Sequence, residues 1–247
     1  MRASVCVLLL VLTSSVCAQT QPPPPSFVPV DPSRLPKAGD RISTHELLIP
    51  QKALKELQRA QSALESGDSL SSARHLERAL QIYPNYLEGH NGLGARYIEL
   101  HEYEKAAAEF QKAIDLDPRV MPPVSNLSVA LFLLQRYADA EAAARRAHDL
   151  DLHNPTACYM LGAILATENR NPEEAMEMLR QTRSEFPDAR LLLAKILVGR
   201  GNVEEAKKEL RAYLLLPDAE KRQNVERWLT RLRQKSAEDS TTQPKMP

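Results

Sequence analysis

The sequence predicts an all-α solenoid, a stack of about five helix-turn-helix units closed by a C-terminal capping helix. From Gln51 onward, apolar residues recur at spacings of three and four, which is typical of one face of a helix. Each two-helix segment ends at a proline, and these prolines lie 30 to 37 residues apart: Pro84, Pro118, Pro155, Pro187 and Pro217. A pair of helices of about 13 residues with two turns consumes roughly 34 residues, and one such hairpin cannot bury its own apolar face, so the hairpins must stack.

Residues 1–18 are predicted to be a secretory signal peptide. Arg2 precedes an apolar run from Val5 to Leu12, and the small-residue pattern ending at Ala18 provides a cleavage site. The run is shorter than the about 20 residues of a permanent transmembrane helix, which disfavours an uncleaved anchor. Lipidation at Cys17 is a second alternative, disfavoured by the bulky Val16 before it. We therefore expect an exported protein, periplasmic or secreted.

The segment between the signal peptide and the helices is predicted to have no packed structure of its own. Residues 19–42 hold seven prolines, four of them consecutive from Pro22 to Pro25, which favours an extended polyproline spacer. Residues 43–50 are apolar again and are interpreted as a short latch against the first helix. Once the signal peptide is removed, Cys158 is the one remaining cysteine, so no internal disulfide is expected.

The repeat array is predicted to span residues 51–217, and a capping helix is predicted over residues 218–235. Within that helix Val225, Trp228, Leu229 and Leu232 share one face, so Trp228, the single tryptophan, is expected in the core. The polar residues 236–247 are predicted to be disordered. The predicted units are about 51–84, 85–118, 119–153, 154–187 and 188–217.

The unit from Leu87 to Pro118 resembles a tetratricopeptide repeat. It has the family's residue types at the family's spacing: Leu93, Gly94, Tyr97, Ala106, Phe110, Ala113 and Pro118. More degenerate copies precede and follow it, among them one with Leu152 where the proline is expected and one with an extra residue near Asn171. The resemblance covers about residues 51–217, and it implies a right-handed superhelix in which Gly94 and Gly162 allow two helices to cross closely.

The glycine cluster at Gly89, Gly92 and Gly94 is interpreted as packing rather than a phosphate-binding loop. Its order is G-x-x-G-x-G, no strand precedes it, and no Lys-Ser or Lys-Thr follows it. Gly94 has a counterpart in Gly162, whereas Gly89 and Gly92 have none, and their role is left as local backbone approach.

We predict no enzymatic activity, cofactor or metal site. The pattern His148, Asp149, Asp151, His153 repeats helix-end aspartates of the preceding unit and lacks the i, i+4 histidine pair of the zinc-protease signature. Cys158 has no basic residue beside it in the sequence and is expected to be a buried structural thiol. The 32 basic and 32 acidic residues balance, which gives no electrostatic reason to expect a nucleic-acid partner.

The resemblance implies a protein-binding function, with the first helices of successive units lining a concave groove for an extended peptide or a helix. The basic side chains of the family's carboxylate clamp are not at the equivalent positions, so that clamp is rejected. We expect an exported scaffold or adaptor; the alternatives are a structural subunit that self-associates in an envelope assembly and a non-catalytic accessory subunit of an exported enzyme complex. The oligomeric state is left open. By position, the predicted groove residues are Glu88, Asn91, Ile98, Glu99, Ser125, Val129, Phe132, Tyr159 and Ala163.

Overall fold

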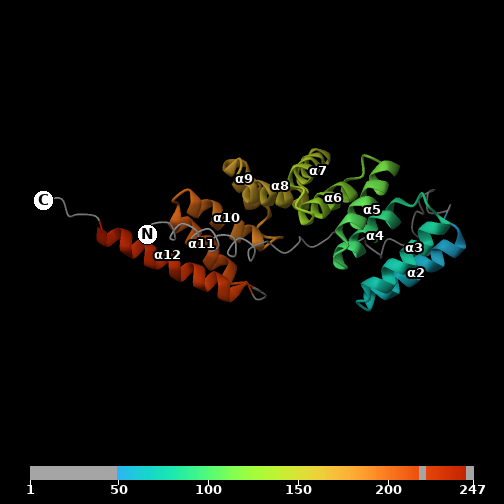
Figure 1. Ribbon diagram of the computed structural model, residues 1–247, viewed down its shortest axis with the longest axis horizontal. Helices are drawn as coiled ribbons and strands as arrows, with labels where there is room; N and C mark the ends of the chain where they lie inside the picture. Colours follow the sequence, from blue (N-terminus) through green and yellow to red (C-terminus); the bar gives the residue numbers. More distant parts are fainter. Residues whose placement is uncertain (1–48, 217–220, 243–247) are drawn as a thin grey trace, which may run out of the picture.

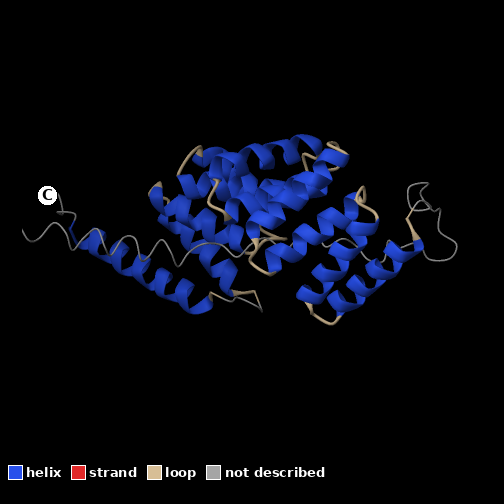
Figure 2. Cartoon of the chain, turned by 45° about the vertical axis from the view of Figure 1, so that its right-hand side comes forward, coloured by secondary structure: helices blue, strands red, loops and turns tan. Residues whose placement is uncertain are grey.

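Eleven α-helices and no strand make up the described residues, 49–216 and 221–242, of the computed structural model (Figure 2). The predicted all-α solenoid is confirmed. The predicted signal peptide 1–18, the spacer 19–42, most of the latch 43–50 and the last residues of the tail lie outside the described residues. No helix in the described part of the chain is long and apolar enough to cross a membrane.

The helices follow one another as five hairpins and a final single helix. The hairpins are α2 (Gln51–Glu65) with α3 (Ser69–Ile82), α4 (Leu87–Glu99) with α5 (Tyr103–Leu116), α6 (Met121–Leu133) with α7 (Tyr137–Leu150), α8 (Pro155–Glu168) with α9 (Pro172–Thr182), and α10 (Asp188–Gly199) with α11 (Val203–Leu214). The final helix, α12 (Arg222–Thr242), continues past residue 235, where the sequence predicted a disordered tail.

The turn inside each hairpin contains a residue with left-handed backbone geometry. Gly67 and Gly201 have φ of 77° and 80°, whereas the corresponding positions in the three middle units are His101, Gln135 and Asn169, at 60°, 60° and 55°. Glycine has no Cβ and adopts this geometry without steric cost. In the fourth unit Asn171 is left-handed as well, at 42°, in the turn where the sequence shows an extra residue. Every hairpin therefore closes through one similar turn.

The small residues predicted at helix crossings lie at close backbone approaches. A Cβ added to Gly94 would lie 2.6 Å from the Phe110 ring, and one added to Gly162 would lie 2.8 Å from Leu179. Gly89 also has a packing reason, because a Cβ there would lie 2.5 Å from the ring of Tyr86. The alanines opposite the crossings are fully buried: Ala106, Ala140, Ala175 and Ala206.

The stack curves so that the first helices lie on its inner side (Figure 1). Helix α4 contacts α6, α6 contacts α8, and α8 contacts α10. The second helices are farther apart and are joined by long side chains, such as Arg145 on α7 with Glu174 on α9 and Arg180 on α9 with Glu205 on α11. Elements on the inside of an arc approach each other more closely than elements on the outside, so the first helices line the concave side.

The cap packs on the last hairpin as the sequence predicted. Val225, Leu229 and Leu232 of α12 are buried in the same apolar cluster as Leu210 and Tyr213 of α11. Trp228 is half-buried against this cluster and so belongs to the core. The capping helix thereby covers the apolar face that the fifth unit would otherwise expose.

Candidate interaction surface

The nine predicted groove residues lie on the first helices α4, α6 and α8, but the structure exposes only two of them. Glu88 and Glu99 are exposed at the two ends of α4. The other seven are between 0% and 7% exposed, which a residue that lines an open groove would not be. The buried ones are Asn91, Ile98, Ser125, Val129, Phe132, Tyr159 and Ala163.

These seven side chains are buried by packing within the units as well as between them. Tyr159 stacks on Phe186 with ring centroids 4.6 Å apart, and its pKa is raised by burial and by Asp188. Phe132 meets Tyr137 edge-on at 5.5 Å within the main apolar cluster. Such side chains stabilise the array, and of the nine predicted residues only Glu88 and Glu99 are open to solvent. Whether any of the nine contacts a partner stays a prediction.

A buried amide pair joins the second and third units. Asn126 on α6 donates its side-chain N–H to Asn91 Oδ1 on α4 at 3.0 Å. Asn126 is 0% exposed and its own Oδ1 has no hydrogen-bond partner among the described residues. Leaving a buried amide oxygen unpaired costs about 1–3 kcal/mol. Asn91 was among the predicted groove residues and Asn126 was not, although both lie on first helices 35 residues apart, about one repeat length.

Arg96 is a second residue that the sequence analysis missed. It lies on α4, is 5% exposed, and its Nη2 donates to Glu99 Oε1 at 2.9 Å. Ser69, at the start of α3, donates to the other Glu99 oxygen at 2.5 Å. Burial lowers the pKa of Arg96, although Glu99 opposes that shift. Glu99 is thus held in place by two units while its side chain remains accessible.

The cysteine is chemically quiet, as expected. The structure brings His148 Nδ1 to 3.5 Å from Cys158 Sγ, a neighbour that the sequence analysis did not foresee. Burial nevertheless raises the pKa of Cys158, and the nearby Asp151 raises it further, so the thiolate is disfavoured. Within the described ranges, no group of three His, Cys, Asp or Glu side chains could hold a metal ion.

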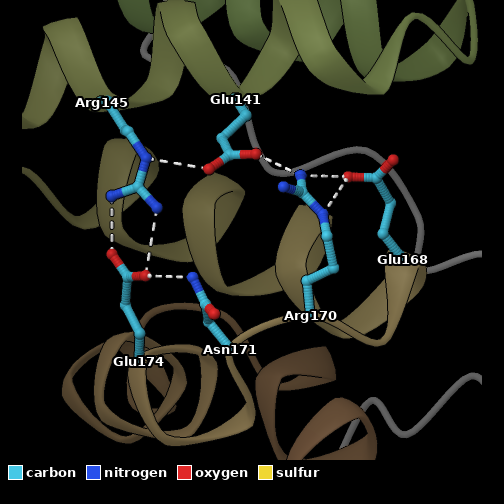
Figure 3. Close-up of polar contacts among 6 residues, drawn as sticks. All are labelled: Glu141, Arg145, Glu168, Arg170, Asn171 and Glu174. Carbon is cyan, nitrogen blue, oxygen red and sulfur yellow. Dashed lines mark hydrogen bonds and ion pairs between the residues drawn. The ribbon is translucent and has the colours of Figure 1, made fainter.

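An ion-pair network connects the third and fourth units (Figure 3). Arg145 donates to Glu141 at 2.9 Å and to both oxygens of Glu174, at 2.6 and 3.1 Å, while Arg170 pairs with Glu141 and Glu168. Burial alone would raise the pKa of Glu141, but the two arginines outweigh it and lower the pKa. Every charged side chain in the network is paired with one of opposite charge, so we interpret the network as a structural contact that holds the two units together.

The family comparison agrees with this geometry. Residues 87–120 and 166–223 each match a family model described as "Tetratricopeptide repeat". Among solved structures, MamA 41-end from Desulfovibrio magneticus RS-1 is 18% identical, with a TM-score of 0.60 over 70% of this chain and 97% of that one. YrrB, described as a TPR protein with an unusual peptide-binding site, is 20% identical, with a TM-score of 0.56 over 71% and 92% of the two chains. At these identities the likeness shows the fold alone.

Two curated relatives are similar to the chain over a short stretch. A UDP-N-acetylglucosamine–peptide N-acetylglucosaminyltransferase of Giardia intestinalis is 35% identical over 51 residues, and a CTR9 homolog of Arabidopsis thaliana is 35% identical over 75. These stretches are 21% and 30% of this chain but span only 3% and 6% of the length of those proteins. Proteins built from such repeats generally serve as protein-interaction scaffolds. Over residues 87–120 and 166–223 the chain is similar to the tetratricopeptide repeat, and its helices stack as a solenoid.

Proposed function

We propose that the protein is an exported scaffold or adaptor that binds an extended peptide or a helix of an envelope or secreted partner along its concave side. The observation that carries this proposal is the continuous row of first helices, in which α4, α6, α8 and α10 contact one another in sequence. A partner can follow such a row from one unit to the next without crossing a gap. Export is supported by the predicted signal peptide at residues 1–18.

The exposed carboxylates give the concave side its chemistry. Glu88 lies in the first turn of α4, and Glu99 lies at its last residue. The Arg96 guanidinium and the Ser69 hydroxyl fix the orientation of Glu99, which lowers the entropy that a partner would have to remove on binding. We therefore expect a partner that places a basic side chain near Glu88, at the start of α4, and a hydrogen-bond donor near Glu99, at its end.

Site-specific photo-crosslinking in the envelope tests the proposal. A photo-reactive residue replaces Glu88, and a matched probe replaces Asp149, an exposed residue near the end of the second helix α7. We expect a discrete heterologous adduct from position 88 and not from position 149. Adducts made only with a second copy of this chain would favour a self-associating subunit, and equal labelling from both positions would contradict a concave-side site. N-terminal sequencing of the exported protein should give a chain that begins at Gln19.

A further inference from the structure

A pocket of about 560 Å³ lies between the first two units, away from the groove positions of α4. Its walls come from the second helices α3 and α5, and its floor comes from α4. The floor positions His90, Leu93 and Tyr97 lie on one face of α4, whereas Glu88, Asn91 and Glu99 lie on others. The apolar part of the lining comprises Leu80, Pro84, Leu93 and Leu116.

The base of the pocket is a satisfied polar cluster. His90, which is 8% exposed, bonds Glu109 Oε2 through Nδ1 at 2.6 Å and donates to the Pro84 carbonyl through Nε2 at 2.7 Å. Lys112 donates to the other Glu109 oxygen at 2.7 Å. Burial alone would raise the pKa of Glu109, but these hydrogen bonds lower it. The charge of Glu109 is therefore neutralised within the protein, and Lys112 is engaged as well.

Two further carboxylates at the rim, Glu77 and Asp115, accept hydrogen bonds from neutral groups instead. Glu77 accepts a hydrogen bond from the Tyr97 hydroxyl at 2.7 Å, and Asp115 accepts one from the Gln111 amide at 2.8 Å. Burial and the neighbouring Glu77 raise the pKa of Tyr97, so its hydroxyl stays neutral. Neither Glu77 nor Asp115 forms an ion pair with any residue that the structure describes. The rim thus offers two carboxylates without a direct ion pair among the described residues, although Lys105 attracts Glu77 at longer range.

The equivalent junction one repeat later is built differently. The counterparts of His90 and Glu109, 34 residues on, are Val124 and Ala143. Val124 is buried there in an apolar cluster with Ile114, Ala147 and Ala157. The pocket is therefore not a by-product of the repeat geometry, because this neighbouring junction is filled by apolar side chains.

We propose that this pocket docks a segment of a partner protein in which an aliphatic or aromatic side chain lies next to Lys or Arg. The apolar side chain would cover Leu116, which is 40% exposed although it is a leucine, above the buried Leu80 and Leu93. The basic side chain would pair with Glu77 and Asp115, neither of which forms a direct ion pair with a described residue. This surface is separate from the concave row of first helices, so its role does not depend on the proposed concave-side function.

Selection from a random phage-displayed peptide library on the purified full chain tests this inference, followed by fluorescence anisotropy with the enriched peptides. We expect enriched peptides to hold an apolar residue adjacent to Lys or Arg. The double variant Glu77→Gln/Asp115→Asn should bind them about tenfold more weakly, as expected for the loss of two exposed ion pairs. Gln81→Trp, which places a large side chain at the exposed rim, should abolish binding without disturbing the core.

A matched control separates the pocket from general surface charge. The double variant Glu104→Gln/Asp149→Asn removes the same charge from exposed positions outside the pocket, and Asp149 is the counterpart of Asp115 one repeat later. We expect it to bind like the original chain. Enrichment of peptides without basic residues, equal loss in both double variants, unchanged binding by Gln81→Trp, or no enrichment above background would each overturn the proposal.

Discussion

Replacing Gln135 by glycine is expected to stabilise the protein. Gln135 closes the third hairpin with φ of 60°, a geometry that costs an L-residue about 1–2 kcal/mol. Glycine removes that cost but increases the freedom of the unfolded chain, which opposes the gain by about 0.4–1 kcal/mol. The net expectation is a gain of roughly 0.5–1 kcal/mol in the free energy of unfolding. The first and fifth units already have glycine at this turn, Gly67 and Gly201.

Urea unfolding followed by circular dichroism measures this effect. His101 has the same φ, but its ring contacts Tyr103, so Gln135 gives the cleaner test. The control is Ala108→Gly on the exposed face of α5, where glycine should cost about 1 kcal/mol. The urea midpoint should therefore rise for Gln135→Gly and fall for Ala108→Gly. A fall for both would refute the argument, because glycine would then act through chain entropy alone.

Three further substitutions or treatments have defined outcomes. Gly94→Ala should lower the free energy of unfolding by about 1–3 kcal/mol in urea titrations, because its Cβ would overlap the Phe110 ring, whereas Gly199→Ala, with open space around it, should not destabilise. Because the pKa of Glu109 is lowered in the folded protein, the ionised carboxylate stabilises the fold above its ordinary pKa, and this stabilisation is lost as the pH falls through the folded-state pKa. Glu109→Gln should therefore flatten the decline of the urea midpoint below about pH 4.5. A decline as steep as that of the original chain would contradict this. Cys158, 2% exposed with a raised pKa, should react with iodoacetamide only after unfolding, as mass spectrometry would show; rapid alkylation of the native protein would contradict it.

The features that could be predicted from the sequence are those that recur in several units. The helix pairs recur in all five, the prolines at their ends in most, and the crossing glycine Gly94 recurs as Gly162 two units later, so each copy supports the assignment of the others. Gly89 was left without a firm account because no other unit has it; its reason is the ring of Tyr86, which becomes visible only when the chain is folded.

The groove residues were harder to predict because helix position alone does not determine exposure. Tyr159 and Ala163 lie on the expected helix, yet the approach of the neighbouring unit buries both. The amide pair of Asn91 with Asn126 and the contact of Glu99 with Ser69 depend on how adjacent units are spaced and on side-chain rotamers. Neither quantity is encoded in the periodicity of a single unit.

The position occupied by His90 shows how a degenerate repeat can acquire specific chemistry. Its counterparts 34 and 68 residues later are Val124 and Cys158, and the carbonyl that ends the preceding unit belongs to Pro84, Pro118 or Leu152. His90 donates to the Pro84 carbonyl at 2.7 Å, Arg146 donates to that of Pro118 at 2.9 Å, and the Cys158 thiol lies 3.7 Å from that of Leu152. The carbonyl at this repeat position is thus contacted by a different side chain in each of the three units.

The junctions at Val124 and His90 differ in the surface that they present. An arginine that reaches across from the second helix leaves the first-helix position free for Val124, and the junction becomes apolar and filled. A histidine at that position bonds Glu109, which in turn accepts a hydrogen bond from Lys112. The junction keeps an open pocket with an acidic rim. Because the helices and turns around these positions are alike, the difference between the filled junction and the open pocket arises from the side chains. Selectivity in this array is therefore expected at the positions where its units differ, and the His90 junction is where that difference creates a pocket.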